Sequence, residues 1–330
     1  MKIWSSLLAV IVLALLAWAG IEVLHLTALF GIIIPYIALA VFLTGFAGRI
    51  IKWGKSPVPF SIPTTCGQQQ SLPWIKQDKI ENPASTWGVI GRMILEIVLF
   101  RSLFRNTRTE KMGSKLAFGS SKWLWLGSMV FHWSLLIILI RHLRFFLNPV
   151  PAAIQGLESL DSFLQIGVPL LYITDVLLVL ALTYLFLRRV AIPQIKYISL
   201  PTDYYPLFLL LGIAASGILM RYFLKVDLAA VKELTMSLVA LKPTVALNIG
   251  AIFYIHLFLI SCLFAYFPFS KLMHAGGIFM SPTRNLANNS RMTRYINPWN
   301  YEVKTHSYAE YEDDFREKMR KAGLPLEKEG

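Results

Sequence analysis

The sequence predicts an all-α integral membrane protein with about six transmembrane helices. Of its 330 residues, 55% are hydrophobic and only 15% are charged, and the mean hydropathy is positive. This composition is typical of membrane proteins. The apolar residues also occur in long runs, and a run of about 20 residues spans a bilayer as a helix.

Six runs reach this length, and their order defines the predicted elements. The first two form an N-terminal hairpin over residues 1–52. The first run begins with Lys2 and ends in Ala17-Trp18-Ala19, which also fits a signal peptide, but the second run follows at once and favours an uncleaved hairpin. The predicted spans are Ile3–Val23, Ala28–Ile51, Trp123–Leu147, Leu164–Leu187, Tyr205–Leu224 and Val245–Phe267.

A seventh apolar stretch, Trp87–Phe104, carries Arg92, Glu96 and Arg101 among apolar residues at helical spacing. This pattern favours an amphipathic helix on the membrane surface over a transmembrane helix. We therefore expect this helix to lie on the membrane surface rather than to cross the bilayer.

Two polar segments flank the last four spans, which occupy residues 123–272. A basic loop covers residues 53–122, and a tail covers residues 273–330 with a charged, helix-prone piece at Ser307–Ala322. Neither segment is long enough to bury a sizeable core alone. We expect both to contact partner proteins.

The distribution of Lys and Arg predicts the orientation of the chain, because cytoplasmic loops collect these residues. They gather in the 53–122 loop and after the fourth span, whereas the loops Asn148–Ser162 and Lys225–Lys242 are poorer in them. Both termini of this multi-pass protein are thus predicted on the inner side of the cytoplasmic membrane. Topology explains most of the net charge of +13, and no binding motif accompanies it, so no nucleic-acid partner is expected.

The two cysteines, Cys66 and Cys262, have no partner at metal-binding spacing. The sequence therefore predicts neither an iron–sulfur cluster nor a covalently attached haem in this chain. Cys262 reads as a small buried residue of the last span, and Cys66 as a free thiol of the loop.

Four histidines are the most informative polar residues of the apolar runs. His132 and His142 lie 10 residues apart in the third span, and His256 and His274 lie 18 residues apart in and just beyond the last span. At about 100° per residue, the two histidines of each span occupy the same side of their helix. Polar residues at such depth usually have a function, although a single buried histidine with a satisfied hydrogen bond is also common.

The predicted helix directions pair these histidines by depth, His132 with His274 on the cytoplasmic side and His142 with His256 further out. Imidazole is a common axial ligand of haem iron, so each pair suits one haem, and the chain would hold two haems b across the bilayer. Straight helices would separate the last two histidines by about 27 Å and the first two by about 15 Å. We expect tilt and a bend at Pro268 to absorb the difference.

With these spacings, the chain resembles the gamma subunit of respiratory nitrate reductase, a dihaem cytochrome b with histidines on the second and fifth helices of a five-helix bundle. Here one extra helix would precede that bundle. The N-terminal hairpin, the long tail and the loop sequence of residues 99–107, LFRSLFRNT, resemble the membrane cytochrome subunit of the sulfite-reduction-associated Dsr complex. That subunit is a relative of the membrane subunit of heterodisulfide reductase.

The resemblance implies a cytochrome b that passes electrons between menaquinol or menaquinone and a cytoplasmic iron–sulfur subunit similar to the catalytic subunit of heterodisulfide reductase. It also implies other membrane and periplasmic subunits of a Dsr-type complex and a role in dissimilatory sulfur metabolism. In the Dsr relatives the partner acts on the disulfide or trisulfide of a small sulfur carrier.

Cationic side chains near the outer histidines are candidates for binding haem propionates. Arginine is the better bidentate partner for a carboxylate, and Arg141 and Arg221 are placed suitably, with Arg144 a weaker candidate. The alternative is that these side chains only reach from the helix ends towards water.

Asp175, inside the fourth span, is a carboxylate at a depth where charge is costly. We expect Asp175 and His142 to form a quinol site in which Asp175 takes protons while electrons pass to the outer haem. Oxidation at this side would release protons outside. A structural hydrogen bond to a neighbouring helix is the alternative for Asp175.

Other functional classes remain open at this point. A non-redox membrane anchor or assembly subunit would keep the fold with buried structural histidines, and the chain would also suit the gamma subunit of a nitrate-reductase-type complex. A transporter fits less well, because the sequence has no inverted repeat and no pair of broken helices.

Overall fold

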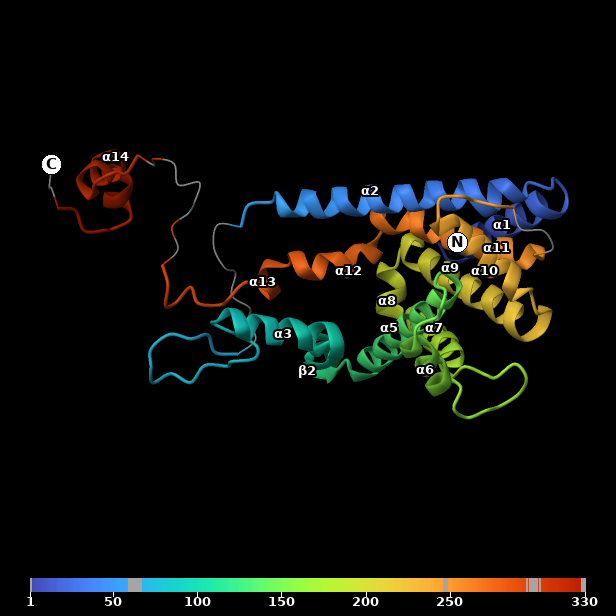
Figure 1. The fold of residues 1–330 in the computed structure, drawn as a ribbon. Coiled ribbons are helices and arrows are strands. Elements are labelled where there is room, and N and C mark those ends of the chain that lie inside the picture. Colours follow the sequence, from blue (N-terminus) through green and yellow to red (C-terminus); the bar gives the residue numbers. More distant parts are fainter. Residues whose placement is uncertain are drawn as a thin grey trace.

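The computed structural model describes residues 2–58, 67–245, 249–294, 296, 302 and 304–327. These residues are mainly helical, and the long helices form a bundle at one end of the molecule (Figure 1). This confirms the all-α membrane class. Cys66 lies outside the described residues.

Within the described part of the chain, five helices are long and apolar enough to cross a membrane. They agree with five of the six predicted spans to within a few residues, except that the last begins later, at Ala251. Four of them begin or end in a short π or 3-10 turn. The elements are α1 (Lys2–Glu22), η1 with α2 (Leu29–Ile33, Ile34–Gly54), α5 with η2 (Lys122–His142, Leu143–Phe145), α9 with η3 (Pro201–Ile218, Leu219–Leu224) and α11 with η4 (Ala251–Tyr266, Phe267–Phe269).

The sixth long helix, α7 (Ile173–Ala191), begins nine residues later than the predicted fourth span. Residues 162–172 form an irregular connection instead, in which Gln165 and Gly167 adopt positive φ angles. Pro169 follows and has no backbone N–H to donate. The 19 residues of α7 cover about 28 Å, close to the thickness of a bilayer core, and α7 packs against α5 and α9.

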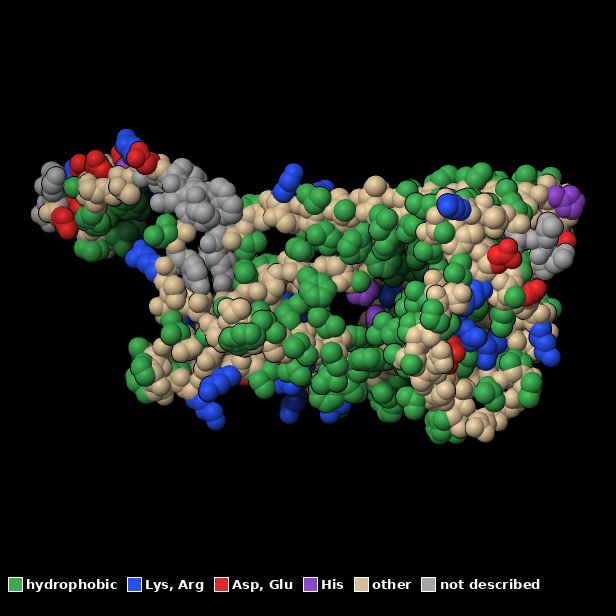
Figure 2. Space-filling model, viewed as in Figure 1, with side chains coloured by type: hydrophobic (Ala, Val, Ile, Leu, Met, Phe, Trp, Pro, Cys, Tyr) green, Lys and Arg blue, Asp and Glu red, His purple; other side chains and the backbone are tan. Residues whose placement is uncertain are grey.

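The helices form two groups. Helix α5 packs against α7, while α11 packs against α1, α2 and α9, and α9 also contacts α7. Buried apolar side chains of α1, η1 and α11 form one core with Val231 and Leu234. Hydrophobic side chains cover much of the visible outer face of the bundle (Figure 2), as expected of a surface in contact with lipid.

Two short helices occupy the loops that we predicted to face outside. They are α6 (Ala152–Asp161) and α10 (Leu228–Val239). Asp227 caps the start of α10, because its carboxylate accepts hydrogen bonds from the N–H groups of Ala229 and Ala230. It supplies Val231 and Leu234 to the core.

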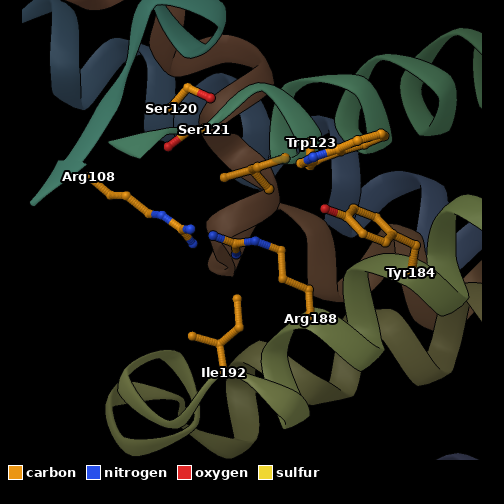
Figure 3. A pocket seen from close by; sticks show the side chains of 8 residues that line it. Arg108, Ser120, Ser121, Trp123, Tyr184, Arg188 and Ile192 are labelled. Carbon is orange, nitrogen blue, oxygen red and sulfur yellow. The ribbon is translucent and has the colours of Figure 1, made fainter. Parts of the chain in front are cut away.

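The basic loop contains more structure than the sequence predicted. Helices α3 (Thr86–Leu99) and α4 (Arg101–Arg105) are followed by an antiparallel hairpin of β1 (Thr107–Met112) and β2 (Lys115–Ser120). Gly113, in the turn, has a φ of 62°, which glycine adopts without strain. The hairpin lies beside the end of α7, so that Arg108 and Arg188 face one cavity (Figure 3).

Helix α3 is amphipathic, as predicted, but its charged residues point inward. Arg92 is 4% exposed and Glu96 5% exposed, whereas Trp87 is 82% exposed. Arg92 donates to the carbonyl oxygens of Glu81 and Thr283. The reason is that the tail folds back against α3 and supplies partners for its polar side.

The loop and the tail therefore pack together, although we predicted two separate partner-binding segments. Glu96 Oε1 lies 2.6 Å from Arg284 Nη1 of α13 (Pro282–Asn285). The fully buried side chain of Asn288 donates to Asn82 Oδ1 at 2.8 Å. Each part supplies hydrogen-bond partners that the other lacks, which buried polar groups need.

After α11 the chain turns repeatedly. The 3-10 turn η4 contains Pro268, Ser270 is extended, and η5 (Lys271–Met273) leads into α12 (His274–Gly277) and η6 (Ile278–Met280). A short helix, α8 (Pro193–Ile198), joins α7 to α9. The predicted charged helix of the tail is present as α14 (Tyr308–Lys321), capped by Ser307 and Glu310.

Candidate functional site

His132 and His274 form the inner histidine pair. His132 lies in the middle of α5, and His274 is the first residue of α12. Their ring centres are 6.0 Å apart, and the ring planes are inclined at 85°. The break in the helix at Pro268 and Ser270 brings His274 back towards α5, so the expected bend is present.

His142 and His256 form the outer histidine pair. His142 is the last residue of α5, and His256, only 8% exposed, lies in α11. The ring centres are 6.5 Å apart and the planes are inclined at 20°. The structure thus brings together the same partners that helix direction and depth suggested.

Three of the four imidazoles have their protonation fixed by a backbone carbonyl. Nδ1 lies 2.8 Å from Ser128 O in His132, 2.7 Å from Ile138 O in His142 and 2.9 Å from Lys271 O in His274. A carbonyl oxygen only accepts, so Nδ1 carries the proton in each neutral ring. The lone pair on Nε2 remains available for a metal, in the arrangement common among metal-binding histidines.

His256 reaches the same state through a serine that we did not predict. The Ser216 hydroxyl donates to carbonyl oxygens of its own helix, Gly212 O at 2.8 Å or Ile213 O at 2.9 Å. It therefore accepts at 2.9 Å from Nδ1 of His256. Gly217 makes room for this ring, since a Cβ there would lie 3.3 Å from His256 Cε1.

The spacing of both pairs fits one metal ion between two imidazoles. A metal–nitrogen bond of about 2 Å on each side, plus about 1.1 Å from each nitrogen to its ring centre, puts the ring centres roughly 6.3 Å apart. The observed distances are 6.0 and 6.5 Å. Helices α5 and α11 pack against different neighbours, which is compatible with a planar metal-binding group, such as a porphyrin, between them.

Two imidazoles alone do not complete the coordination of a free metal ion. In the described part of the chain, no group of three or more His, Cys, Asp or Glu side chains is placed to hold a metal. Haem iron takes its remaining four ligands from the porphyrin. The donor set of each pair therefore suits haem better than a bare ion.

Phe100 lies against the inner pair and was not among our candidates. Its ring meets His132 edge to face with centres 5.0 Å apart, and its φ of 48° ends α3 and starts α4. Two tryptophans of α5 hold this junction, with Trp125 Nε1 2.7 Å from Leu99 O and Trp133 Nε1 3.1 Å from Val98 O. Phe100 lies within residues 99–107, so the loop sequence was the signal available for it.

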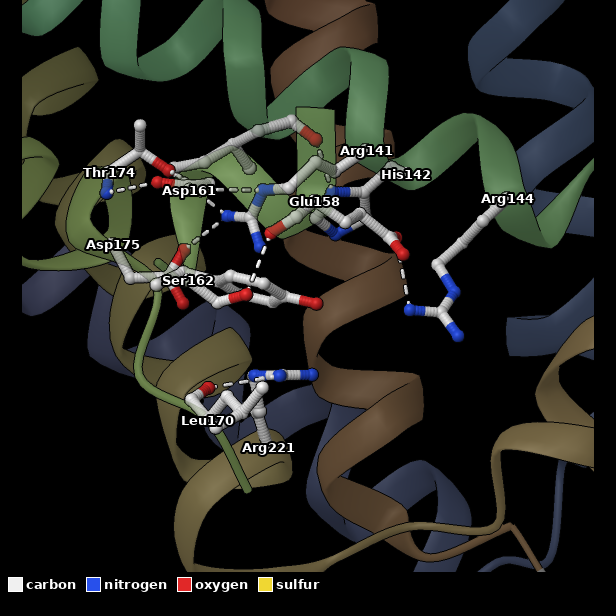
Figure 4. A network of polar contacts seen from close by, with 12 residues as sticks. Arg141, His142, Arg144, Glu158, Asp161, Ser162, Leu170, Thr174, Asp175 and Arg221 are labelled. Carbon is white, nitrogen blue, oxygen red and sulfur yellow. Dashed lines mark hydrogen bonds and ion pairs between the residues drawn. The ribbon is translucent and has the colours of Figure 1, made fainter. Parts of the chain in front are cut away.

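Arg141, which we considered as a partner of a haem propionate, forms ion pairs within the protein. Its Nε lies 2.9 Å from Asp161 Oδ2, and its Nη2 lies 2.6 Å from Asp175 Oδ1 and 3.2 Å from Thr174 Oγ1 (Figure 4). Its guanidinium also lies 3.6 Å from the ring centre of Tyr172. With two carboxylates already bound, this geometry favours a structural role for Arg141.

Asp175 is held by the same network, and Tyr222 donates to its Oδ2 at 2.9 Å. The carboxylate is therefore fixed by an arginine and a tyrosine rather than lying free beside His142. This arrangement favours the alternative that we considered for Asp175, a structural bond between helices. Asp161, which also accepts from the backbone and hydroxyl of Thr174, completes a network that sequence reasoning missed.

Arg221 and Arg144 differ from Arg141 in what they bind. Arg221 stacks 3.9 Å from the ring centre of Tyr172 and donates to Leu170 O at 3.1 Å, while its buried Nε has no hydrogen-bond partner in the described structure. Arg144 pairs with Glu158 at 3.0 Å. Of the three arginines, Arg221 thus retains a donor for an anionic group near the outer pair.

Comparison with known proteins identifies the family of this chain. The family described as nitrate reductase gamma subunit matches residues 85–295, which include all four paired histidines. A protein named Hdr-like menaquinol oxidoreductase cytochrome b-like subunit, from Archaeoglobus fulgidus, is 49% identical over 280 residues, which are 82% of this chain and 83% of that protein. The protein of the same name from Archaeoglobus profundus is 43% identical over 274 residues, 81% of each chain.

Proposed function

We propose that this chain, which belongs to the nitrate reductase gamma subunit family, is a cytochrome b subunit that binds two haems b and exchanges electrons with menaquinol. The observation that carries the proposal is the pairing of four imidazoles with Nδ1 engaged and Nε2 available. A bound haem would supply a site that accepts and returns one electron.

The two pairs suit a transfer path across the membrane. His132 and His142 are ten residues apart on α5, which corresponds to about 15 Å along a helix. Electrons that enter near the outer pair would leave from the inner pair, where the loop and tail pack. Phe100, whose ring meets His132 edge to face, would shield that ring edge from water.

We place the quinol beside the outer pair. Arg221, whose Nε has no hydrogen-bond partner in the described structure, and the Tyr222 hydroxyl would bind the quinol, and Asp175 accepts a hydrogen bond from that hydroxyl. In this arrangement Asp175 would act through Tyr222 rather than by direct contact with quinol. His142 would link the quinol to the outer haem. With both termini cytoplasmic, protons would be released outside.

The names of the two Archaeoglobus relatives support menaquinol as the quinone and an Hdr-like complex as the setting. We propose that the partner is a cytoplasmic iron–sulfur subunit similar to the catalytic subunit of heterodisulfide reductase, bound at the loop and tail. The more specific placement in a Dsr-type complex of dissimilatory sulfur metabolism rests on the resemblance of residues 99–107 and remains part of the proposal.

Haem content of purified single-histidine variants tests the proposal. We expect two haems per chain by the pyridine haemochrome assay, with absorbance that changes on adding dithionite. Alanine at either member of a pair should remove one haem and leave the other. His25→Ala and His306→Ala are the controls and should keep both. A wild-type protein without haem absorbance would favour the non-redox anchor instead.

A further inference from the structure

A polar cavity lies at the opposite end of α5 from His142. It measures about 320 Å³ and opens between the start of α5, the end of α7 and the β-hairpin (Figure 3). None of the haem or quinol candidates lines it. The polar side chains that line it are Arg108, Ser120, Ser121, Tyr184 and Arg188.

The two arginines give the cavity a positive charge. Their guanidinium groups approach each other in the centre of the view in Figure 3. Arg108 Nε pairs with Glu110 Oε1 at 2.5 Å, but within the described residues no carboxylate forms an ion pair with Arg188. Like charges held close together repel, and an anion between them would relieve this repulsion.

Neutral donors complete the cavity. In the part of the chain that the structure describes, the hydroxyls of Ser120 and Ser121 have no hydrogen-bond partner, and Ser121 does not cap α5 with its side chain. Tyr184 also lines the cavity, and its ring packs closely on Gly127 of α5, where a Cβ would lie 2.5 Å from it. Hydroxyls and guanidinium groups around one space are the donors that phosphate oxygens accept from.

We propose that this cavity binds a phosphate group, presented by the headgroup of an anionic phospholipid. The location favours a lipid over free phosphate, because the cavity lies at the ends of two membrane helices and its Trp123 is 75% exposed. Tryptophan is enriched at the membrane–water boundary, and basic pockets between transmembrane helices on the cytoplasmic side bind lipid headgroups. The bound lipid ties the hairpin to the bundle, independently of any haem.

Lipid retention measures this binding directly. The full chain is reconstituted in an equimolar mixture of phosphatidylglycerol and phosphatidylcholine, re-extracted in detergent and analysed by native mass spectrometry. The wild type should retain phosphatidylglycerol selectively, and Arg108→Gln and Arg188→Gln should each reduce its retention about five-fold. Arg108 is exposed, so its variant tests the site even if Arg188→Gln fails to fold.

Lys115→Gln is the matched control, since Lys115 is an exposed residue of the same hairpin and does not line the cavity. It should retain lipid as the wild type does. Equal retention in Lys115→Gln and the arginine variants would overturn the proposal. In a second arm, inorganic phosphate is added to lipid-free protein. Suppose that phosphate stabilises the protein against heat only when both arginines are present, while no lipid is retained selectively. That result would show that the cavity binds free phosphate rather than a lipid headgroup.

Discussion

Replacing Arg141 by Gln should destabilise the protein much more than replacing Arg144 by Gln. The Arg141 side chain is 7% exposed and lies between Asp161, at 2%, and Asp175, at 15%. Arg144 is 37% exposed and has one partner, Glu158. The two residues lie on the same turn of chain and differ mainly in the burial of their ion pairs.

The expected magnitudes follow from this difference. Removing one partner of a buried ion pair costs about 3–5 kcal/mol, because the remaining charge stays buried without compensation. An exposed pair contributes about 0–1 kcal/mol. Arg141→Gln should therefore lower the free energy of unfolding by at least about 2 kcal/mol more than Arg144→Gln. Adding Asp161→Asn and Asp175→Asn should recover part of this loss, since these groups are coupled.

The assay is reversible unfolding in mixed detergent micelles, with haem content measured on the same samples. Equal free energies of unfolding for Arg141→Gln and Arg144→Gln would refute the structural reasoning. A stable Arg141→Gln protein that specifically lost the outer haem would instead restore the propionate role expected from the sequence.

Four further predictions concern the histidine pairs and the packing of the loop against the tail. Ser216→Ala removes the hydroxyl that accepts from His256 Nδ1–H and should weaken haem binding at the outer pair about 10–100-fold, measured as the rate of haem transfer to apomyoglobin. Gly217→Val should abolish binding of that haem in the haemochrome assay, because the valine side chain would collide with the His256 ring. Because the ring planes are inclined at 85° in the inner pair and 20° in the outer pair, the two oxidised haems should give distinct low-spin EPR signals, with the larger maximal g value for the inner one; coincident signals would contradict the ring geometry. Glu96→Gln removes the buried partner of Arg284 and should speed limited proteolysis of the tail several-fold without changing haem content, and an unchanged cleavage rate would show that this pair does not hold the tail.

The helical spans could be predicted closely because a helix in lipid satisfies its own backbone, so apolar run length is nearly sufficient information. The start of α7 could not be predicted from the length of the apolar run. Leu164, Ile166 and Val168 extend the apolar run, but they lie in an irregular, exposed connection. Run length does not distinguish an apolar helix from an apolar loop, and only Gly167 and Pro169 signalled the difference.

Part of the candidate site could likewise be predicted from the sequence, and part could not. Helix direction, together with the bend expected at Pro268, was enough to pair the histidines, because helical rise converts sequence distance into depth. The partners of Arg141 were not accessible, since Asp161 comes from α6, an element that the sequence did not predict. Ser216 and Phe100 were missed because neither residue type is unusual in an apolar helix or loop.

The sequence by itself determined the membrane class, the long helices and which histidines pair, since each follows from composition or from local helical periodicity. The tertiary structure decided which charges are paired. It turned Arg92 and Glu96 inward against the tail, gave Arg141 two carboxylates, and left Arg108 and Arg188 facing one cavity. An ion pair depends on which elements fold next to each other, and that information is not contained in the spacing along any one helix.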